Sequence, residues 1–136
     1  MNLDWKHFTL NTFTDPRGSL TPVELTDFID FEVKRMYTVH HNFQRRGGHA
    51  HLIEREFFML ASGTCTAKIH DGAKWHEIEM KANLDALYIG GNVWHEFDEF
   101  SKGGVLVALS STVYNPDRLD YIEDFDLFMS QFSNKS

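Results

Sequence analysis

The chain is 136 residues long, with 42% hydrophobic residues, 14% aromatic residues and 12 phenylalanines. This apolar content is enough for one domain with its own core, which excludes an intrinsically disordered chain. The formal net charge of −7 argues against non-specific binding to nucleic acid, which is a polyanion. A small anionic ligand is still compatible with this charge, because one or two well-placed arginines can bind a phosphate group.

Cysteine usage and hydropathy bear on the cellular compartment. A single cysteine, Cys65, cannot form an internal disulfide, which suits a reducing environment. The first residues lack the long apolar core of a signal peptide, and no run of 18 uncharged apolar residues occurs. We therefore expect a cytoplasmic protein that does not span a membrane.

The first predicted elements are short strands. A turn signal, Asp-Pro-Arg-Gly at residues 15–18, precedes a predicted strand over residues 19–25. Residues 33–40 then alternate, which places Arg35, Tyr37 and Val39 on one face of a half-buried strand.

The remaining elements continue this pattern almost to the end of the chain. Residues 57–61 form a continuous apolar run and residues 64–70 a second strand, and Asp71-Gly72 predicts a two-residue hairpin turn into residues 74–80. Three more strands are predicted over residues 84–89, 93–97 and 105–110. At least eight strands at intervals of about ten residues indicate a sandwich or barrel. An apolar stripe at helical spacing over residues 125–132 predicts a short C-terminal helix that caps it.

Two histidine motifs narrow the fold. His49 and His51 lie two residues apart at the start of a strand-like run, so both imidazoles should enter one pocket. With Glu56 and Gly63 they complete an H-x-H, four residues, E, six residues, G pattern, which resembles the first motif of the cupin superfamily. Residues 90–95 resemble its second motif in part and end in His95. The resemblance implies a single cupin domain over residues 1–136, an all-β jelly-roll barrel (double-stranded β-helix) with a short C-terminal helix.

Five segments in order carry a narrower resemblance. They are DPRGSL at residues 15–20, RMY at 35–37, RGGHAH at 46–51, LYI with VWHE at 87–96, and DYIEDF at 120–125. Over residues 8–129 the chain is similar to the sugar nucleotide 3,4-ketoisomerases and the related WxcM-like domains.

This resemblance implies an isomerase and its site. Members of the family are homodimeric, use no metal cofactor, and move the carbonyl of a dTDP-linked 4-keto-6-deoxyhexose from carbon 4 to carbon 3. Such products feed the making of amino-deoxy sugars for surface polysaccharides, glycans or antibiotics. The catalytic residues that the resemblance implies are His49, His51 and Tyr37.

The residue types suit this chemistry, because a carbonyl shift through an enediol needs groups that take and return protons near neutral pH. We assign His49 as the base at carbon 3, and His51 as the group that handles the oxygen-bound proton or protonates carbon 4; the reverse order is also open. Tyr37 would hold or polarise a sugar oxygen. The expected substrate-binding residues are Arg46 or Arg35 at the diphosphate, Trp94 stacked on thymine, and Arg17 and His95.

Departures from the family keep two alternatives open. Leu52 stands where the family usually has Lys, and Glu56 where it usually has Gln. With Glu56, the residues His49, His51 and His95 make the set of three imidazoles and one carboxylate that metal-dependent cupins use for Fe, Mn, Ni or Zn. A metal-dependent enzyme is therefore one alternative, and a non-catalytic cupin that binds a small molecule is the other.

Overall fold

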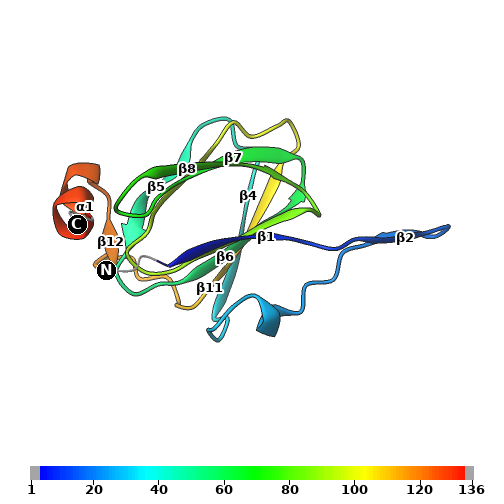
Figure 1. Ribbon diagram of the computed structural model, residues 1–136, viewed down its shortest axis with the longest axis horizontal. Helices are drawn as coiled ribbons and strands as arrows, with labels where there is room; N and C mark the ends of the chain where they lie inside the picture. Colours follow the sequence, from blue (N-terminus) through cyan, green and yellow to red (C-terminus); the bar gives the residue numbers. More distant parts are fainter. Residues whose placement is uncertain (1–3, 134–136) are drawn as a thin grey trace.

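Two antiparallel sheets face each other and enclose the core, as the computed structural model in Figure 1 shows for residues 4–133. The order of the first sheet is β1 (Trp5–Thr9), β9 (Asp85–Ile89), β6 (Glu56–Ser62), β11 (Val105–Ser110) and β4 (Arg35–His40). The order of the second is β12 (Tyr121–Ile122), β5 (Arg46–His51), β10 (Trp94–Asp98), β7 (Thr64–His70) and β8 (Trp75–Lys81). This arrangement confirms the predicted all-β jelly-roll.

Alternating side chains of both sheets fill the space between them. Phe58 and Leu60 point inward from β6, and Ile69 and Met80 meet them from β7 and β8. All four are almost fully buried. Packing of two inner faces in this way is what closes a sandwich or flattened barrel.

The outer faces are also covered, which explains why residues 57–61 are apolar without alternation. Phe57 has no exposed surface, and the N-terminal segment lies over it: the Phe28 ring is 5.8 Å from Phe57 and 4.9 Å from Phe8. On the second sheet, helix α1 (Phe125–Phe132) buries Phe128 against Trp94. The helix was predicted over these residues. The Asp124 side chain caps it by accepting a hydrogen bond from the backbone amide of Leu127.

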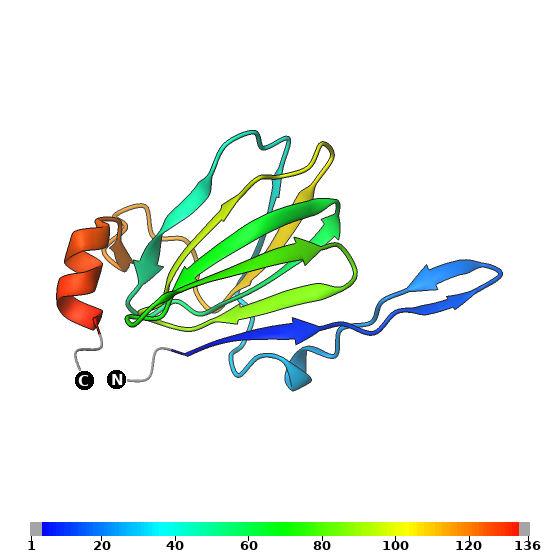
Figure 2. The same cartoon turned by 45° about the horizontal axis from the view of Figure 1, so that its top comes forward.

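The N-terminal region differs from its prediction. The strand expected over residues 19–25 ends early: β3 (Gly18–Leu20) pairs with β2 (Phe13–Asp15), and a short 3-10 helix, η1, follows at Leu25–Asp27. Pro22 has no amide hydrogen to donate, so it does not continue the ladder. The β2–β3 hairpin projects away from the barrel (Figure 2).

The turn between β7 and β8 is longer than predicted. The register pairs His70 with Trp75, which leaves four residues in the connection instead of two. The Asp71 carboxylate accepts the amides of Ala73 and Lys74 and so stabilises this wider turn.

Within residues 4–133, neither helix is long and apolar enough to cross a bilayer.

Candidate active site

Strand pairing brings four ring side chains to one inner face. His49 and His51 share a face of β5, but they lie at the end of that strand, not at its start as expected. His95 of β10 lies opposite His49, and Tyr121 of β12 lies opposite His51. The His49 ring centroid is 4.7 Å from that of His51 and 4.9 Å from that of His95, and the Tyr121 centroid is 4.4 Å from that of His51. The predicted same-side histidine pair is therefore present.

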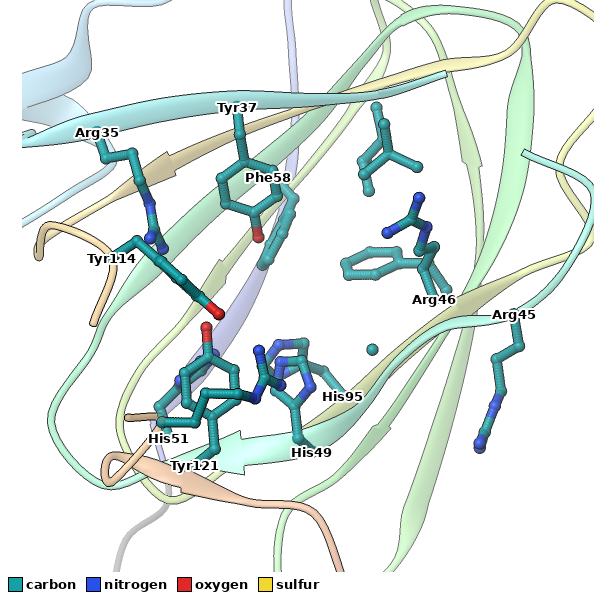
Figure 3. Close-up of a pocket in the computed structure, with 15 residues that line it drawn as sticks. Arg35, Tyr37, Arg45, Arg46, His49, His51, Phe58, His95, Tyr114 and Tyr121 are labelled. Atoms are coloured by element: carbon teal, nitrogen blue, oxygen red, sulfur yellow. The ribbon is translucent and has the colours of Figure 1, made fainter. Parts of the chain in front are cut away.

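The first sheet supplies the opposite wall of a cavity of about 670 Å³, a volume typical of small-molecule sites. Tyr37 and Phe58 both pair with Ala108 of β11, so they occupy the same inward row, and Arg35 belongs to the next row toward Glu56. Figure 3 shows the hydroxyl of Tyr37 directed into the cavity, with the three histidines on the other side. The cavity is lined by Arg35, Tyr37, Val39, Arg45, Arg46, Gly47, His49, His51, Phe58, His95, Phe97, Leu106, Tyr114, Arg118 and Tyr121.

Glu56 joins the two walls beneath the cavity. Its Oε2 accepts a hydrogen bond of 2.5 Å from the Tyr37 hydroxyl. Its Oε1 lies 3.1 Å from Nε2 of His51 and 3.6 Å from Nε2 of His95. Burial opposes the ionised form of this carboxyl, but the hydrogen bonds and charges of the two histidines bring its pKa below the ordinary value.

His51 has carboxylates on both sides of its ring. Nε2 faces Glu56, while Nδ1 lies 3.4 Å from a Glu54 oxygen and 3.6 Å from an Asp120 oxygen. Burial acts to lower the pKa of His51, but the Glu56 hydrogen bond and the three negative charges outweigh it, and the pKa is raised. His51 is therefore suited to hold a proton on each nitrogen.

His49 has the opposite environment. Burial, together with the neighbouring His95 and His51, lowers the pKa of His49 to about 2. His95 in turn contacts the Val93 carbonyl through Nδ1, at 3.1 Å. A carbonyl oxygen can only accept, so Nδ1 of His95 carries the hydrogen in this arrangement. The site thus holds one imidazole that favours the charged form beside one that favours the neutral form.

Three expected substrate-binding residues line the cavity: Arg35, Arg46 and His95. Arg35 is bound to Glu54 through Nη2 at 2.9 Å, and its guanidinium lies over the rings of Tyr37 and Tyr114. Arg46 is exposed at the cavity and donates to Asn42.

Trp94 and Arg17, the other two expected substrate-binding residues, do not line this cavity. Adjacent strand residues point to opposite faces, so Trp94 points outward because His95 points inward. It is 3% exposed and packs under α1. Arg17 is at the tip of the β2–β3 hairpin, where its side chain is 91% exposed and paired with Asp15.

The sequence analysis gave no role to four residues with polar side chains that line the cavity: Arg45, Tyr114, Arg118 and Tyr121. Tyr121 lies in the DYIEDF segment, which was a usable signal, because that segment is among the five that carry the family resemblance. Tyr114 and Arg118 precede it in a connection without periodicity. The Arg118 guanidinium lies 3.9 Å from the centre of the Tyr121 ring, so this connection covers one side of the histidine cluster.

Comparison with known proteins identifies the family. The sequence model of the family described as "FdtA: WxcM-like, C-terminal" matches residues 1–133. The chain belongs to this family.

Named relatives share its length and fold. The TDP-4-oxo-6-deoxy-alpha-D-glucose-3,4-oxoisomerase of Aneurinibacillus thermoaerophilus is 35% identical over 116 residues, which cover 84% of this chain and 82% of the relative. A 3,4-ketoisomerase from Helicobacter canadensis superposes with a TM-score of 0.84 at 32% identity, over 96% of this chain and 98% of the other. A mutant of the 3,4-ketoisomerase QdtA from Thermoanaerobacterium thermosaccharolyticum, in complex with TDP-4-keto-6-deoxyglucose, gives 0.83 at 27% identity over 94% and 93% of the two chains.

Proposed function

We propose that this protein is a sugar nucleotide 3,4-ketoisomerase that moves the carbonyl of a dTDP-linked 4-keto-6-deoxyhexose from carbon 4 to carbon 3. One observation carries the proposal: two histidines of opposite proton affinity share one wall of a ligand-sized cavity, opposite Tyr37. Adjacent groups whose environments push their pKa values apart are suited to act as base and acid in one reaction.

The proton transfers balance with these residues alone. His49, as neutral imidazole, takes the proton from carbon 3, and His51, as imidazolium, protonates the oxygen on carbon 4 to give an enediol. In the second half, neutral His51 takes the proton of the carbon 3 hydroxyl while His49 returns its proton to carbon 4. The low proton affinity of His49 favours this return.

The other polar residues of the cavity fit the rest of the substrate. Arg46 is exposed at the cavity and therefore available to a diphosphate. Arg118 is exposed there as well, but it pairs with Glu123 at 2.6 Å. Arg35 already pairs with Glu54, so its role includes placing that carboxylate near His51. Tyr121 covers the two catalytic rings and limits the access of water to them.

An NMR experiment tests the reaction. The protein is incubated with dTDP-4-keto-6-deoxyglucose in deuterium oxide, and the expected result is a 3-keto product, with deuterium on carbon 4 wherever the proton on His49 exchanges with solvent before it is returned. dTDP-glucose, which has no ketone and cannot enolise, is the control and should show no exchange. Binding of the keto sugar with neither exchange nor a 3-keto product would contradict catalysis and favour a non-catalytic binding protein. Product stereochemistry separates isomerisation from epimerisation, which also exchanges protons.

A second candidate, a metal-dependent enzyme, is favoured by one observation. Ligand atoms of His49, His51, Glu56 and His95 all lie within 4.8 Å of one another. Three imidazoles and a carboxylate have the chemistry to hold Fe, Mn, Ni or Zn, which would supply a Lewis acid for a bound oxygen. Elemental analysis of protein purified without chelator decides between the candidates. About one equivalent of transition metal, lost together with activity in His95→Ala, would favour this one.

The assembly is proposed to be a homodimer. Phe13 and Leu20 on the projecting hairpin are 63% and 65% exposed, and Met36 on the edge strand β4 is 64% exposed. A second copy of the chain would cover such surfaces. Arg17 lies outside the cavity of its own chain, so its expected contact with the ligand requires the cavity of that second copy.

We propose the cellular compartment of the enzyme from its cysteine content, and the use of its product from the chemistry of that product. The single cysteine, Cys65, is buried and unpaired, which suits the reducing cytoplasm. A 3-keto sugar nucleotide is a substrate for amination, so the product would serve deoxysugar and surface polysaccharide biosynthesis.

A further inference from the structure

The three imidazoles that line the cavity belong to one wall. His49 and His51 lie on β5 and His95 on the neighbouring β10, both strands of the second sheet. His95 pairs with His49 in register, and their ring centroids are 4.9 Å apart. Figure 3 shows these rings together on one side of the cavity and the Tyr37 hydroxyl on the other. A proton that any of these rings exchanges with a carbon of the substrate therefore passes on this side.

The opposite wall offers a poor proton donor. Its side chains come from the first sheet and are those of Arg35, Tyr37, Val39, Phe58 and Leu106. Three of these are hydrocarbons and an arginine keeps its proton, so Tyr37 is the one acid among the five. Its hydroxyl hydrogen is held by the Glu56 carboxylate, at an oxygen separation of 2.5 Å. Donation to the substrate would break this hydrogen bond and leave a phenolate beside a carboxylate, which like charges disfavour.

The reaction itself decides which face of the sugar ring meets the histidines. The bond between carbon 3 and its hydrogen breaks most readily when it stands perpendicular to the plane of the adjacent ketone, so the base lies over the face that carries this hydrogen. In a 4-keto-6-deoxyglucose this hydrogen is on the face opposite to the methyl group of carbon 5. With either histidine as the base, that face is turned toward the second sheet.

We propose that the protein returns a proton to carbon 4 on the same face from which it left carbon 3, so that the product is the 3-keto sugar of galacto configuration. The inference rests on the proposed ketoisomerase function and adds the identity of its product. A hydrogen delivered to this face moves the carbon 4 hydroxyl to the face of the carbon 5 methyl group, which is the arrangement of 6-deoxygalactose. The gluco product would instead need a proton from the wall of the first sheet.

The bonds balance along this path. In the first half, His49 takes the carbon 3 hydrogen, the electron pair of that bond becomes the double bond between carbons 3 and 4, and the carbon 4 oxygen takes a proton from His51. In the second half, His51 takes the proton of the carbon 3 hydroxyl, a carbonyl forms there, and the double bond takes the proton of His49 at carbon 4. Exchanging the roles of the two rings leaves the stereochemistry unchanged, because both lie on the same wall.

The configuration of the product tests the proposal. The wild-type protein is incubated with dTDP-4-keto-6-deoxyglucose in ordinary water, so that carbon 4 carries a hydrogen visible by NMR, and spectra are taken before the released product enolises in solution. We expect a 3-keto product with a small coupling between the hydrogens of carbons 4 and 5, which are gauche in the galacto form. The gluco form has two trans axial hydrogens here and a large coupling, and its presence in equal or larger amount would overturn the proposal. Absence of any 3-keto product would instead overturn the ketoisomerase function itself.

Two variants test the side on which the protons pass. Among the described residues that line the cavity, Tyr37→Phe and Tyr114→Phe each remove one of the two phenols outside the second sheet. We expect both variants to form the galacto product, whatever their rates, because neither phenol supplies the proton of carbon 4. Tyr88→Phe, which loses a hydroxyl that contacts Asp30 outside the cavity, is the matched control and should keep both rate and product. A Tyr37→Phe protein that forms no 3-keto product, while His49→Asn still forms it, would place both transfers on the first sheet and overturn the proposal.

Discussion

His49 and His51 show how neighbours decide the role of a residue. They are two positions apart on one strand, yet the pKa of His51 is raised and that of His49 is lowered to about 2. The difference follows from what lies beside each ring. Glu54, Glu56 and Asp120 surround His51, whereas His49 faces His51 and His95. Burial and the other two histidines therefore lower the pKa of the proposed base, His49, whereas the three carboxylates raise the pKa of the proposed acid, His51.

The pH dependence of kcat/KM should report this difference. A raised pKa keeps His51 protonated at pH values above 6.5, so activity is expected to hold above pH 6.5 and to fall as pH rises through the raised pKa. His49 is already unprotonated, so no acidic fall is expected near pH 6.5. Measuring kcat/KM between about pH 5 and 10 checks both limbs. An acidic limb centred near 6.5 would contradict the assignment of His49 as the base.

Substitution of the base should separate chemistry from binding. His49→Asn removes the proposed base at carbon 3, and general base catalysis is typically worth about 10²- to 10⁴-fold. We expect a loss of kcat in this range and a parallel loss of deuterium exchange at carbon 3. Calorimetry should find the affinity for TDP within about threefold of wild type. Unchanged exchange at carbon 3 would assign the base to another residue.

At the scale of elements, the approach of β5 to β10 depends on Gly47. Its φ is +82°, and a Cβ there would lie 2.8 Å from the backbone oxygen of His95, next to the irregularity between His95 and Glu96. Gly48 has a similar φ of +81°, but its Cβ would meet only the flexible guanidinium of Arg45, at 3.2 Å. Both glycines thus have a left-handed backbone conformation, but only at Gly47 would an added Cβ collide with the backbone of another strand.

Gly47→Ala and Gly48→Ala are a matched pair for this reason. Both should lose about 1–2 kcal/mol of stability from the left-handed conformation, but Gly47→Ala should lose more and also reduce kcat, because it displaces the backbone that carries His95. Urea unfolding and steady-state kinetics measure the two effects. Equal losses of stability and activity in both variants would show that the close backbone approach has no role.

The strands that carry a two-residue period were foreseen from the sequence. The predicted face of Arg35, Tyr37 and Val39 does line the cavity, and the same-side prediction for His49 and His51 is confirmed. The two-residue period of a strand is enough for these predictions, because each of them concerns side chains on one face of a single strand.

Contacts that depend on pairing between distant strands could not be predicted. Tyr121 reaches the histidines only because β12 pairs with β5, and Tyr114 and Arg118 follow from where that pairing places the preceding connection. Glu54 was missed because residues 52–55 have no period; its carboxylate is placed by Arg35 and Ser110.

At the scale of the whole molecule, the negative charge and the arginine-lined cavity are compatible. Despite the net charge of −7, four arginines gather at the cavity: Arg35, Arg45, Arg46 and Arg118. Within residues 4–133 three of them pair with a glutamate, which leaves Arg46 without an acidic partner. Local cations attract a diphosphate at short range even in an acidic protein, since salt screens the more distant charges. The overall charge then disfavours polyanions without opposing a small anionic substrate.

The projecting hairpin exposes large apolar side chains, which have no function in an isolated monomer. Phe13 and Leu20 pair on it and remain mostly exposed, and the hairpin itself extends away from the barrel (Figure 1). Large apolar side chains on a thin, solvated hairpin give little stability to an isolated chain, but they would contribute to an interface with a second copy.

Sedimentation equilibrium should therefore give twice the chain mass of 15.8 kDa. Phe13→Ser combined with Leu20→Ser removes apolar area from the proposed interface, and the mass should shift toward 15.8 kDa as the protein is diluted. Leu119→Ser, at a 76% exposed position just before β12 and at the opposite end of the barrel, is the matched control and should remain dimeric. A wild-type mass of one chain at all concentrations, or a hairpin variant that dimerises as tightly as wild type, would contradict this assembly.

If the dimer is confirmed, Arg17→Ala should raise KM for the sugar nucleotide, because Arg17 can then meet a ligand only across the interface.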